Sequence, residues 1–468
     1  MKKRVVIIGG GPGGYEAALV GYAQGADVTI VEDKGMGGNS VLLDCVPSKS
    51  FIAGSNIKTD LRRADEMGLN DALAEAKLSL TALNARVTEL AQNQSADIQA
   101  QMKRVGVRVV TGRAYFAEEQ STTTLHRVAV DLADGDTEVI EADIVLIATG
   151  SHPRVLPSAK PDGDRILNWQ QIYSLKEMPS HLVVVGSGVT GAEFVSAFAE
   201  LGTKVTMVAS RDRILPHDDA DAADTLEKVL SERGVLLEKD ARVESVENTG
   251  EGVIVRTQDG REITGSHCLM SIGAIPNTEG LGLENLGVEV TESGHIHVDR
   301  VSRTNISEIY AAGDCSDLMP LASVAAMQGR IAMNHALGDS VQPLRLKTAS
   351  QAVFTRPEIA TVGVSEREIS DQGAGTRTIM LPLTSNPRAK MRSLRHGFVK
   401  LFASEYSGRI LGGVIVAPTA SELILPVTLA VAKGLTVEDL ANTFSVYPSL
   451  SGSITEAARR LVKHEHLD

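Results

Sequence analysis

The segment that decides the fold is Arg4-Val5-Val6-Ile7-Ile8-Gly9-Gly10-Gly11-Pro12-Gly13-Gly14, near the start of the chain. The apolar run before the glycines predicts a buried strand, and a helix is expected to follow to about Gln24. Asp27–Glu32 predicts a second strand. A strand, a glycine-rich turn, a helix and another strand form a βαβ unit with a right-handed crossover and parallel strands. We therefore expect an α/β fold here.

The glycines of this turn have separate tasks if the turn binds a dinucleotide. Gly9 permits the tight turn, Gly11 lets the backbone approach a pyrophosphate, and Gly14 lets helix and strand pack closely. The helix that follows this turn, which includes Pro12 and Gly13, offers unpaired N–H groups at its N-terminus to phosphates. Glu32 ends the second strand and is placed to accept hydrogen bonds from a ribose diol. The alternative interpretation is a glycine-rich turn without a ligand.

The same pattern occurs a second time, farther along the chain. Leu182–Val185 predicts a strand, Gly186, Gly188 and Gly191 have the spacing of the first turn, and Lys204–Val208 predicts the next strand. A lone glycine pattern is a weak signal, but a strand before it and a helix after it strengthen it. The repeat therefore predicts two dinucleotide sites in one chain.

The second copy lacks the acid that would end its second strand. Val208 is followed by Ala209, with Arg211 and Arg213 close behind. An acid there would bind a 2′-hydroxyl and repel a 2′-phosphate, whereas an arginine accommodates the phosphate. We expect this site to accept NADPH or NADH. A solvated loop is the alternative interpretation of the two arginines.

Composition excludes several classes of protein. The chain has 468 residues, and acidic residues outnumber Lys and Arg by 59 to 46, for a formal charge of −13. No basic block stands out, so nucleic acid is not an expected partner. Cys45, Cys268 and Cys315 fit neither a disulfide framework nor a metal site, and no apolar run is long enough for a membrane span. We expect a cytoplasmic protein without a bound metal, in which Cys268 and Cys315 are core residues.

Other segments complete the predicted organisation. The spacing of Leu80, Leu83, Val87 and Leu90 is typical of a helix packed on the core. Two further strands end in small residues that suit close approach of a ligand. These are Asp143–Ala148, followed by Thr149 and Gly150, and Cys268–Ile272, followed by Gly273. From about Arg345 the pattern favours a separate α+β domain. Its expected elements are the strands Gly397–Phe402 and Ile410–Val416 and the helix Ser421–Gly434.

Five motifs, taken together and in order, resemble the pyridine nucleotide–disulfide oxidoreductases, the family of dihydrolipoamide dehydrogenase and glutathione reductase. The motifs are Gly9–Tyr15, Ala148-Thr149-Gly150, Tyr310–Asp314, Leu321–Ala325 and Phe354–Ala360. The resemblance implies an α/β protein with two Rossmann-like dinucleotide-binding domains, for FAD and NAD(P), and a C-terminal α+β dimerisation domain. It divides the chain into residues 1–150 (FAD), 151–275 (NAD(P)), 276–344 (returning to FAD) and 345–468 (the interface of a homodimer).

The resemblance also assigns residues to the cofactors. It places Asp314, after Gly313, at the ribitol or phosphate part of FAD, and Lys49 and Glu193 as a charged pair beside the flavin N5. A buried charged pair there would tune the reduced flavin electrostatically. An ordinary surface lysine and helix glutamate are the alternative. Further predicted cofactor-binding positions are Thr149, Gly150, Leu321 and Ala322 in these motifs, Gly38 in the segment with Ser40 and Cys45, and Gly273 after the strand Cys268–Ile272.

Two departures from the family pattern bear on function. The family's redox disulfide joins two cysteines in the segment where this chain has Ser40 and Cys45. A serine hydroxyl cannot form a disulfide, so no dithiol can exchange electrons with the flavin. The family's C-terminal His and Glu, which serve thiol exchange, are replaced by Tyr447 and Gly452. Disulfide reductase activity is therefore not expected.

The remaining chemistry is a flavin that NAD(P)H reduces and that passes electrons directly to an acceptor. The favoured hypothesis is a FAD-dependent NAD(P)H:quinone oxidoreductase, in which Tyr447 stacks on the quinone or binds its oxygen, or merely fills the volume of the lost imidazole. Cys45 either polarises the flavin as a thiolate or is an inert thiol. The alternative functions are a soluble NAD(P) transhydrogenase and a non-catalytic flavin-binding scaffold.

Overall fold

Contacts in the computed structural model, which describes residues 2–69, 77–118, 125–372 and 375–462, divide the chain into two compact units. Unit 1 consists of Met1–Ser50, Ala82–Arg154 and Gly273–Leu346. Unit 2 consists of Phe51–Thr81, Val155–Ile272 and Lys347–Asp468. Each unit is thus assembled from three separate stretches of sequence. The finer division into four segments stays a prediction.

Unit 1 is built on a seven-stranded sheet with the order β17-β6-β1-β2-β3-β4-β5. The strands are β17 (Ile309–Ala311), β6 (Ile144–Ile147), β1 (Arg4–Ile8), β2 (Asp27–Glu32), β3 (Arg108–Phe116), β4 (His126–Leu132) and β5 (Thr137–Ala142). The first five run parallel and the last two pair antiparallel. The predicted first βαβ unit is therefore confirmed. A short antiparallel pair, β7 (Ser151–Pro153) and β16 (Ala274–Pro276), completes this unit.

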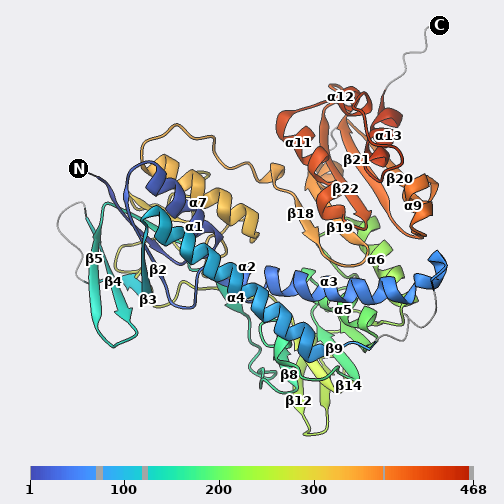
Figure 1. Cartoon of the computed structure of the whole chain (residues 1–468), viewed down its shortest axis with the longest axis horizontal. Helices are drawn as coiled ribbons and strands as arrows, with labels where there is room; N and C mark the ends of the chain where they lie inside the picture. Colours follow the sequence, from blue (N-terminus) through green and yellow to red (C-terminus); the bar gives the residue numbers. More distant parts are fainter. Residues whose placement is uncertain (1, 70–76, 119–124, 373–374, 463–468) are drawn as a thin grey trace. The chain divides into compact units, whose positions relative to one another are not determined.

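The helices of unit 1 include two that pack face to face through glycine. The helices are α1 (Pro12–Ala23), α2 (Gly38–Leu42), α4 (Leu80–Val105) and α7 (Ala322–Ala336). Helices α1 and α7 lie side by side (Figure 1). A Cβ atom on Gly329 of α7 would lie 2.0 Å from the Gly13 carbonyl oxygen of α1. Glycine is required there because any side chain would overlap the neighbouring backbone.

One predicted core residue of α4 lies outside the core. Leu80, Leu83 and Val87 are buried, as expected, but Leu90 is 36% exposed. The buried face continues through Ala91 instead. Successive residues are turned by about 100° around a helix, so Leu90 falls at the rim of the stripe that Val87 and Ala91 define. The prediction of Leu90 as a core residue is wrong.

The second glycine repeat lies in unit 2 and forms a parallel sheet with the order β11-β10-β9-β15-β8. The strands are β11 (Leu236–Glu238), β10 (Lys204–Val208), β9 (His181–Val185), β15 (His267–Met270) and β8 (Ile166–Asn168). Helices α5 (Val189–Leu201) and α6 (Ala220–Glu232) follow β9 and β10. A small antiparallel sheet of β12 (Val243–Asn248), β13 (Val253–Thr257) and β14 (Glu262–Gly265) adjoins them. The second βαβ unit is confirmed.

The C-terminal part of unit 2 is an antiparallel sheet with helices, as the sequence predicts. The strands are β18 (Gln351–Val353), β19 (Glu358–Gly363), β22 (Ile410–Ala417), β21 (Phe398–Ser404) and β20 (Thr376–Pro382). The helices are α8 (Glu366–Gln372), α9 (Pro387–Met391), α10 (Ala420–Leu423), α11 (Leu425–Lys433), α12 (Val437–Ala441) and α13 (Gly452–Leu461). The single helix predicted over Ser421–Gly434 is wrong. Helix α11 starts anew with Pro426 at its N-terminus, where the missing N–H has no cost.

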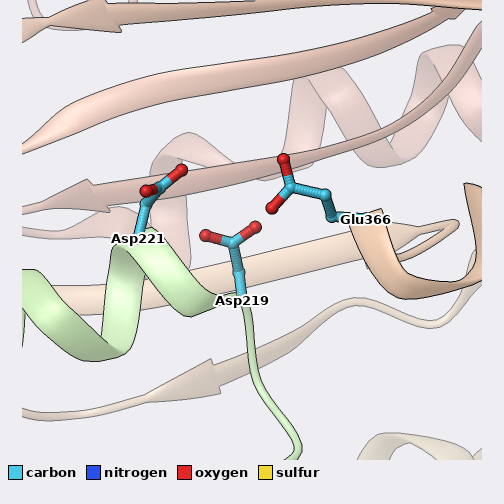
Figure 2. A group of neighbouring side chains, drawn as sticks. All are labelled: Asp219, Asp221 and Glu366. Atoms are coloured by element: carbon cyan, nitrogen blue, oxygen red, sulfur yellow. The ribbon is translucent and has the colours of Figure 1, made fainter. Parts of the chain in front are cut away.

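A buried lysine joins two parts of unit 2. The ammonium of Lys400 on β21 lies 2.9 Å from Asp219, 2.5 Å from Asp221 and 3.2 Å from Glu366. Figure 2 shows the three carboxylates converging: Asp219 lies just before α6, Asp221 on α6 and Glu366 at the start of α8. Burial alone would lower the pKa of Lys400, but its bonds to Asp221 and Asp219 outweigh burial and raise it. A charged lysine therefore provides the cation that these carboxylates require.

Asp218, next to this cluster, makes stability depend on pH. Burial raises the pKa of Asp218 to about 6; His217 opposes the shift and Asp219 adds to it. The unfolded chain loses this proton near pH 4 and the folded chain near pH 6, so stability falls as pH rises between these values. Asp218→Asn is expected to raise the free energy of unfolding by about 1–3 kcal/mol at neutral pH.

Urea unfolding at several pH values checks this expectation. The difference between Asp218→Asn and the wild type should vanish below about pH 4, where both forms of the chain carry the proton. Asp212→Asn is the matched control, because Asp212 is an exposed aspartate in the same loop. A constant difference across the whole pH range would contradict the assignment.

Candidate functional site

The first glycine turn has no room for a side chain at two of its positions but has open space at a third. Gly9 has a φ of +108°, and a Cβ atom on Gly14 would lie 1.9 Å from the Gly9 carbonyl oxygen. Around Gly11, in contrast, a Cβ atom would meet no atom within 4 Å. The turn thus packs tightly on strand and helix at Gly9 and Gly14 and leaves space at Gly11. This is the arrangement expected of a pyrophosphate cradle.

Glu32 is held beside this cradle. One carboxylate oxygen accepts a 2.6 Å hydrogen bond from the Gly10 N–H, and the other accepts a 2.7 Å bond from the Lys34 N–H. Burial raises the pKa of Glu32, and these two backbone bonds oppose the shift. Each oxygen keeps a further lone pair, so the fixed carboxylate can still accept hydrogen bonds from a diol.

The segment with Ser40 and Cys45, where the resembled family has its redox disulfide, packs against the same turn. A Cβ atom on Gly38, at the start of α2, would lie 3.0 Å from the Gly11 Cα atom. Helix α3 (Cys45–Arg62) follows, and on its first turn Ser48 is only 2% exposed. Among the residues that the structure describes, the hydroxyl oxygen of Ser48 has no hydrogen-bond partner. A buried polar atom without a partner is costly, so this hydroxyl, next to the glycine turn's neighbouring segment, is a candidate contact for a ligand.

Sequence reasoning missed Ser48. Its only signal was its place one residue before Lys49 within the quoted family segment. A serine in a helix is usually unremarkable, because the chain context rather than the residue type decides whether its hydroxyl is satisfied.

Ser40 and Cys45 have different environments. The Ser40 hydroxyl donates a 3.0 Å hydrogen bond to the Gly37 carbonyl, and Cys45 is half-buried at the first residue of α3. Cys268 and Cys315 are buried, as predicted, and burial raises the pKa of both thiols. Position 40 thus carries a bonded hydroxyl where a dithiol would need a second sulfur.

The remaining positions assigned to the flavin lie at the carboxyl ends of neighbouring parallel strands. Strands β17, β6 and β1 end beside one another, and Gly313, Thr149 and Gly9 follow within two residues of their last residues. The Ser151 hydroxyl donates a 2.9 Å bond to Asp314, and the Thr149 hydroxyl donates a 2.7 Å bond to the Asn277 carbonyl. Ligands of α/β sheets bind beyond these strand ends.

The other predicted positions of unit 1 are two glycines in open space and the start of α7. Gly150 and Gly273 have positive φ angles, and a Cβ atom on either would meet no atom within 4 Å, so both leave open space. Leu321 is the N-cap of α7 and Ala322 its first residue. A Cβ atom on Gly313 would lie 3.2 Å from Ala325 of α7. The start of this helix therefore packs on the strand end that carries Asp314.

The second glycine turn repeats the geometry of the first. Gly186 has a φ of +111°, and a Cβ atom on Gly191 would lie 2.1 Å from the Gly186 carbonyl oxygen. Gly188 has open space, as Gly11 does. After β10, Ala209 is buried and Arg211 is exposed, while Arg213 pairs with Asp224 at 3.4 Å. Arg211 thus stays a predicted contact for a 2′-phosphate.

Glu193 and Lys49 belong to different units. Glu193 of α5 is buried and accepts a 2.9 Å hydrogen bond from the Phe354 N–H. Three residues on, the Ser196 hydroxyl accepts a 3.1 Å bond from the Arg356 N–H. These bonds hold α5, with Glu193, against the connection between β18 and β19 of the C-terminal sheet. Its pairing with Lys49 of α3 stays a prediction.

Tyr447 lies on an exposed apolar segment before α13. Its side chain is 83% exposed, and Phe444 and Val446 beside it are exposed too. Gly452 begins α13 and its N–H donates a 3.1 Å bond to the Ser449 hydroxyl. A segment with three large exposed apolar side chains indicates a surface that another molecule covers.

Comparison with known proteins identifies the family to which the chain belongs. The sequence profile described as pyridine nucleotide-disulphide oxidoreductase matches residues 3–329, and that of the family's dimerisation domain matches residues 349–458. The chain belongs to the pyridine nucleotide-disulphide oxidoreductase family. Membership in this family implies FAD and a nicotinamide nucleotide as cofactors. The resemblance drawn from the five sequence motifs is thereby confirmed, together with the fold class.

Family members of known name resemble the chain over nearly its full length. An NAD(P)H dehydrogenase (quinone) from Mycobacterium tuberculosis is 56% identical, covering 100% of this chain and 96% of that protein. Dihydrolipoyl dehydrogenase 2 from Haloarcula marismortui is 33% identical, covering 97% and 95%. The crystal structure of LpdA from Mycobacterium tuberculosis superposes with a TM-score of 0.95 at 56% identity, covering 98% of this chain and 100% of that one.

Two observations concern membrane spans and cation sites. Within residues 2–69, 77–118, 125–372 and 375–462, no helix combines the length and the apolar character that crossing a bilayer requires. The acidic group Asp219, Asp221 and Glu366 has the composition of a cation site, but Lys400 occupies its centre.

Proposed function

We propose that the protein is a FAD-dependent NAD(P)H:quinone oxidoreductase that passes electrons from the flavin directly to the quinone. The observation that carries the proposal is Ser40, whose hydroxyl bonds to Gly37 where the family has a redox-active sulfur. The family's disulfide to Cys45 therefore cannot form in this segment. The 56% identity to a protein named NAD(P)H dehydrogenase (quinone) supports the same function.

The residues of unit 1 fit a flavin dinucleotide. The open space at Gly11, the fixed carboxylate of Glu32 and the unpartnered Ser48 hydroxyl are the features that FAD would occupy and satisfy. When bound, FAD supplies a two-electron carrier between NAD(P)H and the acceptor. We assign its binding to Gly9, Gly11, Pro12, Gly13, Gly14, Glu32, Gly38, Lys49, Thr149, Gly150, Gly313, Asp314, Leu321 and Ala322.

Unit 2 fits the nicotinamide nucleotide. Gly186, Gly188 and Gly191 would cradle its pyrophosphate, and Arg211 would bind a 2′-phosphate. Buried Glu193 would hold a fixed orientation through its bond to the Phe354 N–H. The Glu193 carboxylate and the Lys49 ammonium, placed beside the reacting ring, would stabilise charge on that ring electrostatically. Neither group would form a covalent bond to it.

We infer a homodimer in which the partner subunit's Tyr447 reaches the acceptor. The dimerisation-domain profile covers residues 349–458, and Phe444, Val446 and Tyr447 lie exposed within it. Tyr447 would stack on a quinone ring or donate its hydroxyl proton to a quinone oxygen in a hydrogen bond. Cys45 stays a candidate for polarising the flavin from the start of α3.

Steady-state turnover tests the proposed function. Purified flavin-loaded protein should oxidise NADPH or NADH much faster when benzoquinones or naphthoquinones are added than with oxygen alone. A rate no higher than that with oxygen would reject the proposal. Hydride transfer from NADPH to an NAD⁺ analogue in the absence of quinone would support the transhydrogenase hypothesis instead.

The choice between NADPH and NADH tests Arg211. Arg211→Ala is expected to raise the KM for NADPH about tenfold and leave the KM for NADH unchanged, because only NADPH carries the 2′-phosphate that a charged hydrogen bond would stabilise. Lys204→Ala is the control, since Lys204 is an exposed cation at the opposite end of β10. Equal changes in both KM values would contradict the assignment.

A further inference from the structure

We propose that a basic patch on the C-terminal sheet docks the protein on an anionic membrane surface. The patch consists of Arg388, Lys390, Met391, Arg392 and Arg395, on and just after the short helix α9. The proposal goes beyond quinone reduction, which requires only an acceptor that reaches the flavin.

The cations of the basic patch are exposed and available. Pro387–His396 contains four Lys or Arg residues and no acid, in a chain whose formal charge is −13. All four side chains are exposed, and no carboxylate pairs with any of them among residues 2–69, 77–118, 125–372 and 375–462. Sequence analysis overlooked this patch because the cations are interleaved with Ala, Met, Ser and Leu rather than consecutive.

Exposed apolar side chains surround these cations. Met391 is 56% exposed. The Arg63 guanidinium donates a 2.9 Å bond to the Ser393 carbonyl, which brings the 3₁₀ turn Ala64–Met67 beside the patch. Met67 and the following Leu69 are exposed. That turn carries two acids: Glu66 is paired with Arg63 at 2.7 Å and interacts with Arg395, and Asp65 is exposed. The four cations of the patch outnumber these two carboxylates, so the patch keeps a net positive charge.

The basic patch adjoins the segment that carries Tyr447. The Asn386 side chain, at the N-cap of α9, donates a 3.0 Å bond to the Ser449 carbonyl and a 2.8 Å bond to the Ser453 hydroxyl. Helix α9 lies beside β20 at the edge of the sheet (Figure 1). A membrane bound at the patch would therefore lie near Tyr447, where a lipid-soluble quinone could leave the bilayer.

The combination of charges and apolar tips favours lipid over other polyanions. Lys and Arg near an anionic bilayer gain from its negative surface potential, and aliphatic side chains gain further by entering the headgroup region. A nucleic-acid backbone offers the charge but no apolar region for Met391, Met67 and Leu69. The attraction should weaken as salt screens it.

Vesicle flotation with the flavin-loaded full-length protein tests the proposal. The protein should float with vesicles that mix phosphatidylcholine and phosphatidylglycerol and stay behind with pure phosphatidylcholine vesicles. Arg388→Gln, Lys390→Gln, Arg392→Gln and Arg395→Gln combined should weaken binding to the mixed vesicles at least about hundredfold. Wild-type binding that remains in high salt should depend on the apolar side chains. Met391→Gln alone should therefore remove this remaining binding.

A matched variant controls for net charge. Lys103→Gln, Arg104→Gln, Lys160→Gln and Lys228→Gln combined remove the same charge from exposed positions elsewhere and should leave flotation unchanged. Equal loss in both variants, or no flotation of the wild type, would overturn the proposal. So would equally tight binding to a DNA duplex, or a change from dimer to monomer that assigned the patch to the subunit interface. Turnover with a water-soluble quinone should be the same in all variants, which separates docking from the proposed activity.

Discussion

Gly11→Val is expected to abolish flavin binding while the protein still folds. Gly11 has φ −69° and ψ −176°, which valine adopts readily, and its Cβ position is open in the structure. The new side chain would therefore clash with the pyrophosphate and not with the protein. We expect affinity for FAD to fall at least about hundredfold, or about 2.7 kcal/mol. Absorbance of flavin retained after gel filtration, with urea unfolding of the apoprotein, measures both effects.

Two other glycines serve as controls for Gly11→Val. Gly14→Ala should destabilise the fold itself, because its Cβ atom would lie 1.9 Å from the Gly9 carbonyl oxygen. Gly188→Val should retain flavin but lose reduction by NADPH, since the same open position occurs in the second turn. Normal flavin content in Gly11→Val would refute the placement of the pyrophosphate.

Lys400→Met is expected to be the most destabilising single change outside the glycine turns. It would leave the buried carboxylate of Asp219 without its cation, beside Asp221 and Glu366. Removing one partner of a buried ion pair costs about 3–5 kcal/mol. Urea unfolding should show this loss, whereas Lys228→Met, an exposed lysine of α6, should change stability little.

A divalent cation should partly rescue Lys400→Met. The three carboxylates offer oxygen atoms that all lie within 4.8 Å of one another, and Ca²⁺ prefers such ligands. Added Ca²⁺ should therefore raise the midpoint of unfolding in Lys400→Met and not in the wild type. A variant as stable as the wild type without Ca²⁺ would contradict the role of Lys400.

The strand–turn–helix repeats could be predicted because each local signal agrees with the others. Gly9, Gly14, Gly186 and Gly191 each occupy a place where any side chain would overlap backbone, so the sequence spacing reports a steric requirement directly. The exposure of Leu90 and the break in the helix predicted over Ser421–Gly434 were harder to predict. Whether a leucine at the rim of a stripe is buried, or a helix restarts at a proline, depends on packing that periodicity alone does not contain.

The candidate site was predictable where chemistry is tied to residue type. Replacement of a cysteine by Ser40 excludes a disulfide whatever the surroundings. Ser48 could not be found in the same way, because its hydroxyl becomes informative only when it is seen buried and without a partner. The basic patch likewise required the fold, which brings Ser393 to Arg63 and Met67 to the exposed cations.

The central claim is that no second redox couple lies between flavin and acceptor, and an anaerobic titration with NADPH tests it most directly. If Ser40 prevents any thiol relay, one equivalent of NADPH should bleach the bound flavin completely, and one equivalent of quinone should restore its colour. Uptake of two equivalents before bleaching is complete, or oxidation of the reduced protein by a small disulfide, would contradict the account.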